Sequence, residues 1–230
     1  MPISHDDRFI FIHIPKTAGS SIVESLLTVR PNLDFMARNA WPRLFAHPRG
    51  AELFRQLRVF YPLNPMALFP EQHYPARVLR EMVPAEVWSS YFKFTFVRNP
   101  WDFVVSSYFF LKKTFSEDPR VAMEAIDVAY IMASVDFTNF VRARKFMANS
   151  IGLLPHVTDQ GGNLLVDFVG KVENIEADLA EICRRVGLNI PLEHRNRSEH
   201  AQYREYYTDE TRAIVAADFA PEIERFGYRF

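Results

Sequence analysis

The fold of this chain is organised around the sequence FIFIHIPKTAGSS, residues 9–21. Its first six residues are aromatic or β-branched except for His13, and they show no polar alternation. Such a run is typical of a strand that is covered on both faces inside a parallel sheet. Pro15 ends the strand, and apolar residues at helical spacing follow from Ile22 onward. We therefore expect a strand, a tight loop and the start of a helix.

The loop after this strand is small and rich in hydroxyl groups, since four of the five residues 17–21 are Ser, Thr or Gly. At the start of a helix, such a loop presents backbone N–H groups and the positive end of the helix dipole, which favour anions. Its lysine adds a mobile positive charge. The alternative is an ordinary turn with a surface lysine, because the loop lacks the Gly-Lys-Ser/Thr of a Walker A motif. The predicted phosphate or sulfate site consists of Lys16, Thr17, Ala18, Gly19, Ser20 and Ser21.

Chain length and composition favour one compact domain. With 230 residues the chain is long enough for one full α/β domain and short for two, so we expect a single domain over residues 1–230. Hydrophobic residues make up 48% of the chain and charged residues 24%, which is ordinary globular composition. The formal net charge of −1 gives no overall attraction for nucleic acid, so we expect no nucleic-acid partner.

Cysteine content and the N-terminal residues bear on the compartment. Cys183 is the single cysteine, which excludes an intrachain disulfide framework and a zinc site built from several thiolates. Residues 1–8 do not form a basic-then-apolar leader. No apolar run approaches the roughly 18 residues that a membrane span requires. We therefore expect a cytoplasmic protein without a transmembrane segment.

A second stretch rich in aromatic residues, residues 91–97, ends as abruptly as the first. It is followed by Asn99, a good N-cap, and then by a proline, which suits the first helical position. Asp102 lies in the first turn, where its charge complements the helix dipole. The sequence predicts a strand over 91–97 and a helix over about 100–112.

A third strand is expected over residues 164–173, after a hairpin turn at 159–163. Strands of the buried type that alternate with helices predict an α/β fold with a central, mainly parallel sheet. In such sheets ligands bind beyond the carboxyl ends of the strands. Lys16 and Arg98 both follow such an end, and Ser106 lies two turns into the helix after Arg98 with a small hydroxyl side chain.

The region between the first two strands is rich in proline, and residues 31–84 hold eight of the 15 prolines. Loops and short helices are expected there. His73 lies just ahead of a helix that Pro75 can start. Two basic stretches are either solvated surface or the surface that meets a substrate: Arg43, Arg49, Arg55 and Arg58 in the first half of the chain, and Arg142, Arg144 and Lys145 in the second.

Two motifs together resemble the sulfotransferase superfamily. IPKTAGSS, residues 14–21, looks like the loop of that family that binds a 5′-phosphosulfate, and FVRNPWDFVVS, residues 96–106, looks like its 3′-phosphate motif. FVGKVENI (168–175) and YREYYTDE (203–210) resemble family 2, the branch that contains carbohydrate sulfotransferases. The likeness runs from residue 9 almost to the C-terminus, and it is weakest over residues 31–70.

This resemblance implies a three-layer fold like that of P-loop NTPases, with helices flanking the sheet. It also implies 3′-phosphoadenosine 5′-phosphosulfate as the donor and no metal. Lys16 and the loop amides would then hold the 5′ end and stabilise the charge that develops as the sulfuryl group leaves. Arg98 and Ser106 would hold the 3′-phosphate. Arg197 and Ser198, with Arg195 beside them, stand where related enzymes close a loop over the nucleotide.

The acceptor hydroxyl needs a general base, and a histidine with a pKa near the reference value of about 6.5 suits that role. By analogy with the carbohydrate branch the base is His73, which with Lys16 completes the expected catalytic pair. The alternative for His73 is a loop histidine that merely packs. His13 is the rival base, because it sits near the end of the first strand. The further candidates are His47, His194 and His200.

The expected activity is therefore transfer of a sulfuryl group to a hydroxyl of an acceptor, with a glycan or a small molecule as that acceptor. One alternative is a non-catalytic nucleotide-binding protein on the same fold. Another is a kinase on a P-loop-like fold, but such an enzyme needs a Gly-Lys-Ser/Thr loop and a metal-holding aspartate, and neither pattern is present. No His, Asp and Glu cluster has the spacing of metal ligands, so no metal site is expected. The oligomeric state stays open.

Overall fold

The computed structural model describes residues 1–35, 46–53, 55, 73–117, 136–143, 152–191 and 202–230. The chain divides into two compact units. The sheet unit is made of Met1–Leu57, Phe69–Val97 and Leu153–Arg197, and the helical unit is made of Arg58–Leu68, Arg98–Gly152 and Ser198–Phe230. That the whole chain forms one domain stays a prediction.

The sheet unit contains a five-stranded sheet in the order β3-β1-β2-β4-β5. Its central strand β2 runs parallel to β4, and β4 runs parallel to β5, while β1 is antiparallel to both β2 and β3. The three parallel strands are those expected from the sequence, so the α/β class is confirmed. The strands are β1 (Pro2–Ser4), β2 (Phe9–Ile12), β3 (Asp34–Phe35), β4 (Phe92–Val97) and β5 (Phe168–Lys171).

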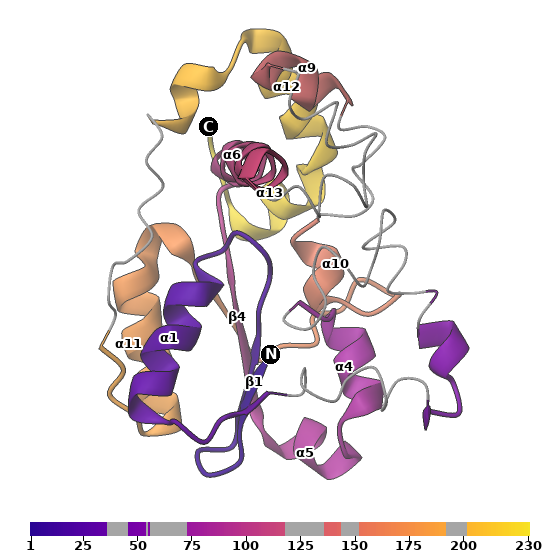
Figure 1. Ribbon diagram of the computed structural model, residues 1–230, viewed down its shortest axis with the longest axis vertical. Coiled ribbons are helices and arrows are strands. Elements are labelled where there is room, and N and C mark those ends of the chain that lie inside the picture. The colour runs from indigo at the N-terminus through magenta and orange to yellow at the C-terminus, as the bar shows by residue number, and fades with distance from the viewer. Residues whose placement is uncertain (36–45, 54, 56–72, 118–135, 144–151, 192–201) are drawn as a thin grey trace. The chain divides into compact units, whose positions relative to one another are not determined.

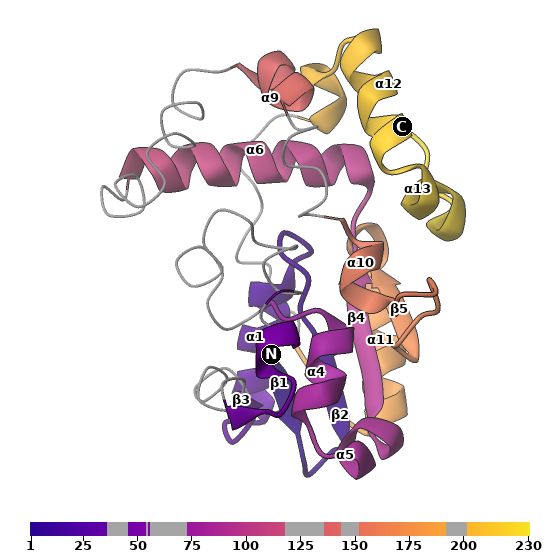
Figure 2. The same cartoon turned by 90° about the vertical axis from the view of Figure 1, so that its right-hand side faces the viewer.

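Helices cover both faces of this sheet (Figures 1 and 2). On one face α1 (Gly19–Val29) and α11 (Ile175–Val186) pack against the aromatic side chains of β2 and β4. The other face carries α4 (Ala76–Met82) and α10 (Leu154–Val157), and α5 (Ala85–Ser90) follows α4. The aromatic layer of the core consists of Phe9, Phe11, Phe94 and Phe96, all fully buried.

Local sequence explains how α11 begins and ends. Two acidic residues lie in its first turn and two arginines in its last, which matches the helix dipole at both ends. Asp178 in that first turn also accepts a hydrogen bond from the backbone N–H of Lys171 at 2.6 Å, so the carboxylate ties the helix to the end of β5. Gly187 ends the helix with a φ of 72°, a backbone conformation that favours glycine.

In the described part of the helical unit, α6 (Pro100–Glu117) is the long element, and it runs five residues beyond the end expected at residue 112. Asn99 caps it as predicted, because its side-chain oxygen accepts from the backbone N–H of Trp101 at 3.1 Å. The other elements are α9 (Phe137–Ala143), the 3₁₀ helix η5 (Tyr203–Tyr206), α12 (Asp209–Asp218) and α13 (Ala220–Phe226).

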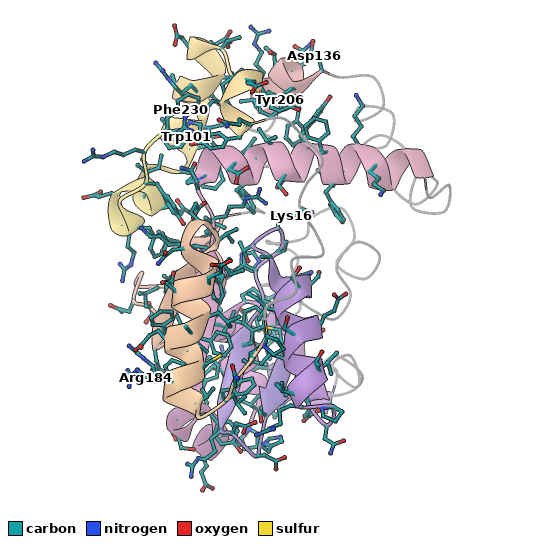
Figure 3. The ribbon with its side chains drawn as sticks, turned by 90° about the vertical axis from the view of Figure 1, so that its left-hand side faces the viewer. Lys16, Trp101, Asp136, Arg184, Tyr206 and Phe230 are labelled. Atoms are coloured by element: carbon teal, nitrogen blue, oxygen red, sulfur yellow. The ribbon has the colours of Figure 1, made fainter. Side chains whose placement is uncertain are left out.

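Aromatic side chains hold the helical unit together. Trp101 at the start of α6 meets Phe230 edge to face with ring centroids 5.5 Å apart, and both are labelled in Figure 3. The Trp101 indole donates to the carbonyl of Arg212 at 3.1 Å, and the hydroxyl of Tyr207 donates to the carbonyl of Trp101 at 2.8 Å. Trp101 is buried, and its contacts with the half-buried Tyr207 and Phe230 fix the start of α6 within this unit.

Several expectations fall on residues that the structure does not describe. The basic residues Arg43, Arg58, Arg144 and Lys145 lie outside the described ranges, as do most of residues 118–151. In the ranges given above, no helix is both long and apolar enough to span a membrane.

Candidate functional site

The loop between β2 and α1 has the backbone of an anion site. Lys16 and Ala18 have positive φ angles of 64° and 60°, which are uncommon for residues with a side chain. A backbone that alternates in this way turns successive N–H groups toward one point, where they can hold an anion. Thr17 is fully buried, and its hydroxyl donates to the carbonyl of Ile14 at 2.9 Å, which closes the loop. Figure 3 labels Lys16 in this loop.

The backbone N–H groups in the first turn of α1 can donate hydrogen bonds to a ligand. The helical ladder begins with the bond from the Ile22 N–H to the Ala18 carbonyl, 3.1 Å. The backbone N–H groups of residues 19–21 precede that ladder, no side chain caps the helix, and no acidic residue lies in its first turn. The first turn of α1 thus contributes no carboxylate of its own to neutralise the positive end of the helix, which suits a negatively charged ligand.

Gly19 is required by His13. A Cβ atom at Gly19 would lie 1.8 Å from His13 Cδ2 and 1.9 Å from His13 Nε2, so no larger residue fits. The His13 ring is 3% exposed and stacks on Phe11 with centroids 5.6 Å apart. The imidazole therefore lies directly against the backbone where α1 begins. Sequence reasoning treated Gly19 as a loop residue and missed this contact, which joins residues six apart.

His73 is tied to the same histidine through the main chain. Its Nδ1 atom lies 3.0 Å from the carbonyl oxygen of His13, and the two rings meet edge to face with centroids 4.2 Å apart. A carbonyl oxygen only accepts hydrogen bonds, so the hydrogen must be on Nδ1 of His73. In the neutral ring the lone pair is then on Nε2, which is the state a general base needs.

Burial keeps these histidines neutral. It lowers the pKa of His73 to about 4, against the opposing effect of its hydrogen bond to the His13 carbonyl. A positive charge on His156 would lower that pKa further, as does the charge of Lys16. Burial also holds the pKa of His13 well below its usual range, and a charge on His73 would lower it more. The value for His73 lies below the 6.5 expected from sequence.

His156 is a third histidine of this group that sequence reasoning did not single out. It lies on α10 with 1% of its surface exposed, and its charge would lower the pKa of both His13 and His73. The four-residue helix α10 has little periodicity, so the sequence held no signal for this placement. Protonation of one histidine in the group disfavours protonation of the others.

The second motif places Arg98 at the start of the helical unit. Its Nε atom donates to Asp102 Oδ2 at 2.7 Å, and the two side chains are 12% and 20% exposed. Asp102 was expected only to complement the helix dipole, but it also orients the guanidinium. Ser106 follows Asp102 by four residues on the same face of α6, as its place in the helix predicts, and it is buried with 6% of its surface exposed.

The strand register fixes where β2 and β4 end within the sheet unit. Ile12 of β2 pairs with Thr95 of β4, and the Thr95 hydroxyl donates to the Ile12 carbonyl at 2.7 Å. The parallel strands therefore end at the same edge of the sheet. Lys16 follows the first strand and Arg98 is the next residue after the second. Arg195, Arg197 and Ser198 lie outside the described residues, as do His194 and His200.

Comparison with known families matches residues 1–229 to the model of the sulfotransferase family. An uncharacterized protein of Archaeoglobus fulgidus is 30% identical over 121 residues, which cover 52% of this chain and 87% of that relative. The family match includes both motifs, from the loop with Lys16 to the helix after Arg98. The chain therefore belongs to the sulfotransferase family.

Proposed function

We propose that this protein transfers the sulfuryl group of 3′-phosphoadenosine 5′-phosphosulfate to a hydroxyl group of an acceptor, without a metal ion. Family membership supports sulfotransfer in general. The observation that carries the finer proposal is the hydrogen bond between His73 Nδ1 and the His13 carbonyl, because it holds a neutral base in one tautomer. His13 itself packs against the start of α1, so the base is supported by the same residue as the anion loop.

The 5′ end of the donor is assigned to the loop between β2 and α1. The backbone N–H groups at the start of α1 and the ammonium of Lys16 would bind its phosphosulfate oxygens. As the bond from sulfur to the bridging oxygen breaks, negative charge develops on that oxygen. Lys16 can neutralise this charge, so its main contribution is to the transition state rather than to binding. Thr17 keeps the loop closed through its bond to the Ile14 carbonyl.

The 3′-phosphate is assigned to Arg98 and Ser106. The guanidinium of Arg98 is oriented at Nε by Asp102, and a guanidinium keeps its terminal nitrogens in a fixed plane relative to Nε. Such a fork matches two phosphate oxygens, and a serine hydroxyl can donate to a third. This phosphate distinguishes the donor from ATP. A protein that requires the 3′-phosphate for binding is therefore a sulfotransferase rather than a kinase.

His73 is assigned the proton of the acceptor. The acceptor oxygen attacks sulfur, the bond from sulfur to the bridging oxygen breaks, and the hydroxyl proton passes to Nε2 of His73. The products are a sulfate ester, 3′-phosphoadenosine 5′-phosphate and a protonated His73, which returns its proton to water. A pKa of about 4 makes His73 a weak base in the empty protein, and two bound phosphate groups would raise it.

A transfer assay tests this proposal. The protein is incubated with donor carrying a radiolabelled sulfuryl group and with a panel of glycans and small alcohols, and the products are separated by charge. We expect label on at least one hydroxylated acceptor, and the same panel with labelled ATP should remain unlabelled. Donor that binds but labels no acceptor supports the non-catalytic alternative, and labelling from ATP supports the kinase.

The remaining features of the proposal follow from the family likeness. They are a three-layer fold related to the P-loop NTPases, a carbohydrate as the acceptor, and the nucleotide-covering role of Arg197 and Ser198. A cytoplasmic location is proposed separately, because the single cysteine fits a reducing compartment.

A further inference from the structure

A cluster of three polar side chains lies near the amino ends of the parallel strands, whereas the anion loop follows the carboxyl end of β2. Ser4, the last residue of β1, pairs with Phe9 at the start of β2, and Phe9 pairs in turn with Phe92 at the start of β4. His5 directly follows Ser4, and Tyr91 directly precedes Phe92. The register therefore brings His5 and Tyr91 to the same end of the sheet.

His5 lies between a phenol and a carboxylate. Its Nδ1 atom is 2.9 Å from the hydroxyl oxygen of Tyr91, and its Nε2 atom is 3.5 Å from Oδ2 of Asp34 in β3. A carboxylate only accepts hydrogen bonds, so in the neutral ring the hydrogen belongs on Nε2. The lone pair is then on Nδ1, and the Tyr91 hydroxyl donates to it.

The sheet fixes the main chain from which these side chains extend. The N–H of Phe92 donates to the carbonyl of Arg8, in the turn between β1 and β2, at 2.8 Å. The ammonium of Lys93 donates to the carbonyl of Tyr91, also at 2.8 Å. Asp34 lies in β3, which pairs with β1. The three side chains therefore start from main-chain segments that hydrogen bonds already hold.

The cluster is open to solvent. The side chains of His5 and Asp34 are 52% and 41% exposed, and Tyr91 is half-buried. The guanidinium carbon of Arg8 lies 5.7 Å from the centre of the Tyr91 ring. A positive charge there attracts the negative charge that develops on a phenol oxygen as its proton leaves. A small molecule can thus reach the hydroxyl from solvent.

A hydroxyl, an imidazole and a carboxylate in this order can activate an oxygen as a nucleophile. The imidazole takes the proton as the oxygen attacks, and the carboxylate keeps the imidazole in the tautomer that can accept it. The 2.9 Å between Nδ1 of His5 and the hydroxyl of Tyr91 is within the reach that such a pair needs. The alternative is a hydrogen bond that only ties the turn after β1 to the start of β4.

We propose that Tyr91 is a covalent modification site that accepts an acyl group from an activated ester, with His5 as its base and Asp34 as the positioning residue. The Tyr91 oxygen attacks the carbonyl carbon of the ester, and the bond from that carbon to the leaving oxygen breaks. The phenol proton passes to Nδ1 of His5, which returns it to water. The products are an acyl ester of Tyr91 and the anion of the leaving group.

A labelling experiment tests this site. The full-length protein is incubated with 4-nitrophenyl acetate, without any nucleotide, and samples are quenched in acid at intervals. Peptide mapping by mass spectrometry then gives an acetylation rate for each tyrosine. We expect Tyr91 to be acetylated fastest of the nine tyrosines in the chain, and faster than free N-acetyltyrosinamide.

His5→Gln separates the base from the structural tie. The Gln amide oxygen can still accept from the Tyr91 hydroxyl, but the side chain has no basic nitrogen. The acetylation rate of Tyr91 should fall by about 10²-fold, the lower end of the usual contribution of a positioned base. The unfolding temperature should stay near that of the wild type, because His5 is at the surface.

Asp34→Asn should lower the acetylation rate of Tyr91 by only about 2- to 5-fold, since exposed charged pairs contribute little. Asp34→Glu, which keeps the carboxylate, should recover that loss. His47→Gln is the matched control, because Nδ1 of His47 accepts from the backbone N–H of Arg49 rather than from a tyrosine. It should leave acetylation of Tyr91 unchanged.

Two results overturn the proposal. One is an acetylation rate of Tyr91 that is the same in the wild type and in His5→Gln, which would show that the hydrogen bond is only a tie. The other is a wild-type Tyr91 that reacts no faster than N-acetyltyrosinamide. Because no nucleotide is present, neither result depends on whether the protein transfers sulfuryl groups.

Discussion

His73 Nδ1 and the carbonyl oxygen of His13 are 3.0 Å apart, and this contact decides which nitrogen of His73 can take up a proton. The carbonyl belongs to the residue that follows β2, so the position of the base is set by the main chain of the central strand. The ring of the same residue packs on Gly19 at the start of α1. One residue therefore supports the base with its backbone and the anion loop with its side chain.

Replacing His73 by Asn should separate its hydrogen bond to the His13 carbonyl from its action as a base. The Asn amide can donate to the His13 carbonyl as Nδ1–H does, but it has no basic nitrogen. We expect His73→Asn to stay folded, to bind donor nucleotide normally, and to lower kcat by about 10²–10⁴, the usual contribution of a positioned base. Thermal unfolding, calorimetry with the nucleotide and steady-state kinetics measure these three properties.

His73→Gln is the control, since its longer amide fits the His13 carbonyl less well. It should lose as much activity as His73→Asn and more stability. A His73→Asn variant that turns over like the wild type contradicts the assignment of the base. If His13→Asn lowers kcat by about 10²–10⁴ and His73→Asn does not, His13 is the base instead.

Gly19→Ala should disturb the anion loop because the new methyl group meets the His13 ring. Overpacking of this kind costs about 1–3 kcal/mol, and we expect weaker nucleotide binding together with a lower unfolding temperature. In a double-mutant cycle His13→Ala removes the ring, so the methyl group should cost less in that background. A cost of Gly19→Ala that is the same with and without the His13 ring rules out this contact as the cause.

The pKa of His73 predicts acid sensitivity. A folded-state pKa of about 4 lies below the reference value of about 6.5, so the unfolded chain binds more protons between these two values. The stability that neutral His73 contributes is complete above about pH 6.5 and is lost as pH falls toward 4, on the order of 3 kcal/mol in all. Denaturant titrations from pH 4 to 8 measure this loss.

His73→Asn should flatten that dependence, apart from the part due to His13, whose pKa is also lowered. The acidic limb of kcat/KM for the donor, which reports the pKa of the empty protein, should likewise fall below the pH of 6.5 that an ordinary histidine gives. An unfolding free energy with the same pH slope in both proteins shows that His73 is not the group responsible.

Asp102→Asn tests whether Arg98 is positioned by its partner. The variant keeps a side chain of the same shape and removes the charge that holds Nε. We expect weaker binding of the nucleotide with a 3′-phosphate by up to about 10-fold, and unchanged binding of the nucleotide without it. Asp209→Asn is the control, because that carboxylate forms an ion pair with Arg212 at the surface of α12 and is 94% exposed. Equal effects of the two variants on nucleotide affinity would show that the affinity depends on the overall charge of the protein and not on the ion pair with Arg98.

Sequence patterns predicted the parts of the fold that depend on local chemistry. The three parallel strands are rich in aromatic and β-branched residues, Asn99 caps α6 as expected, and the bridge between Thr158 and Leu164 confirms the hairpin turn. The strands β1 and β3 were missed, because stretches of three and two residues carry no measurable periodicity.

The contacts that define the candidate site lie beyond the reach of a local pattern. His73 meets His13 across 60 residues, and the fit of the His13 ring on Gly19 depends on the angle at which α1 leaves the loop. The ion pair of Arg98 with Asp102 could have been found, since residues four apart share a helix face. It was overlooked because the helix dipole already accounted for an acidic residue in the first turn.

The donor assignment is the central claim, and calorimetry with two nucleotides tests it most directly. 3′-phosphoadenosine 5′-phosphate and adenosine 5′-phosphate differ only in the group assigned to Arg98 and Ser106. Loss of one charge-assisted hydrogen bond costs about 1.5–3 kcal/mol, so the first nucleotide should bind at least about 10-fold more tightly than the second. Equal affinity for the two nucleotides in the wild-type protein would contradict the claim.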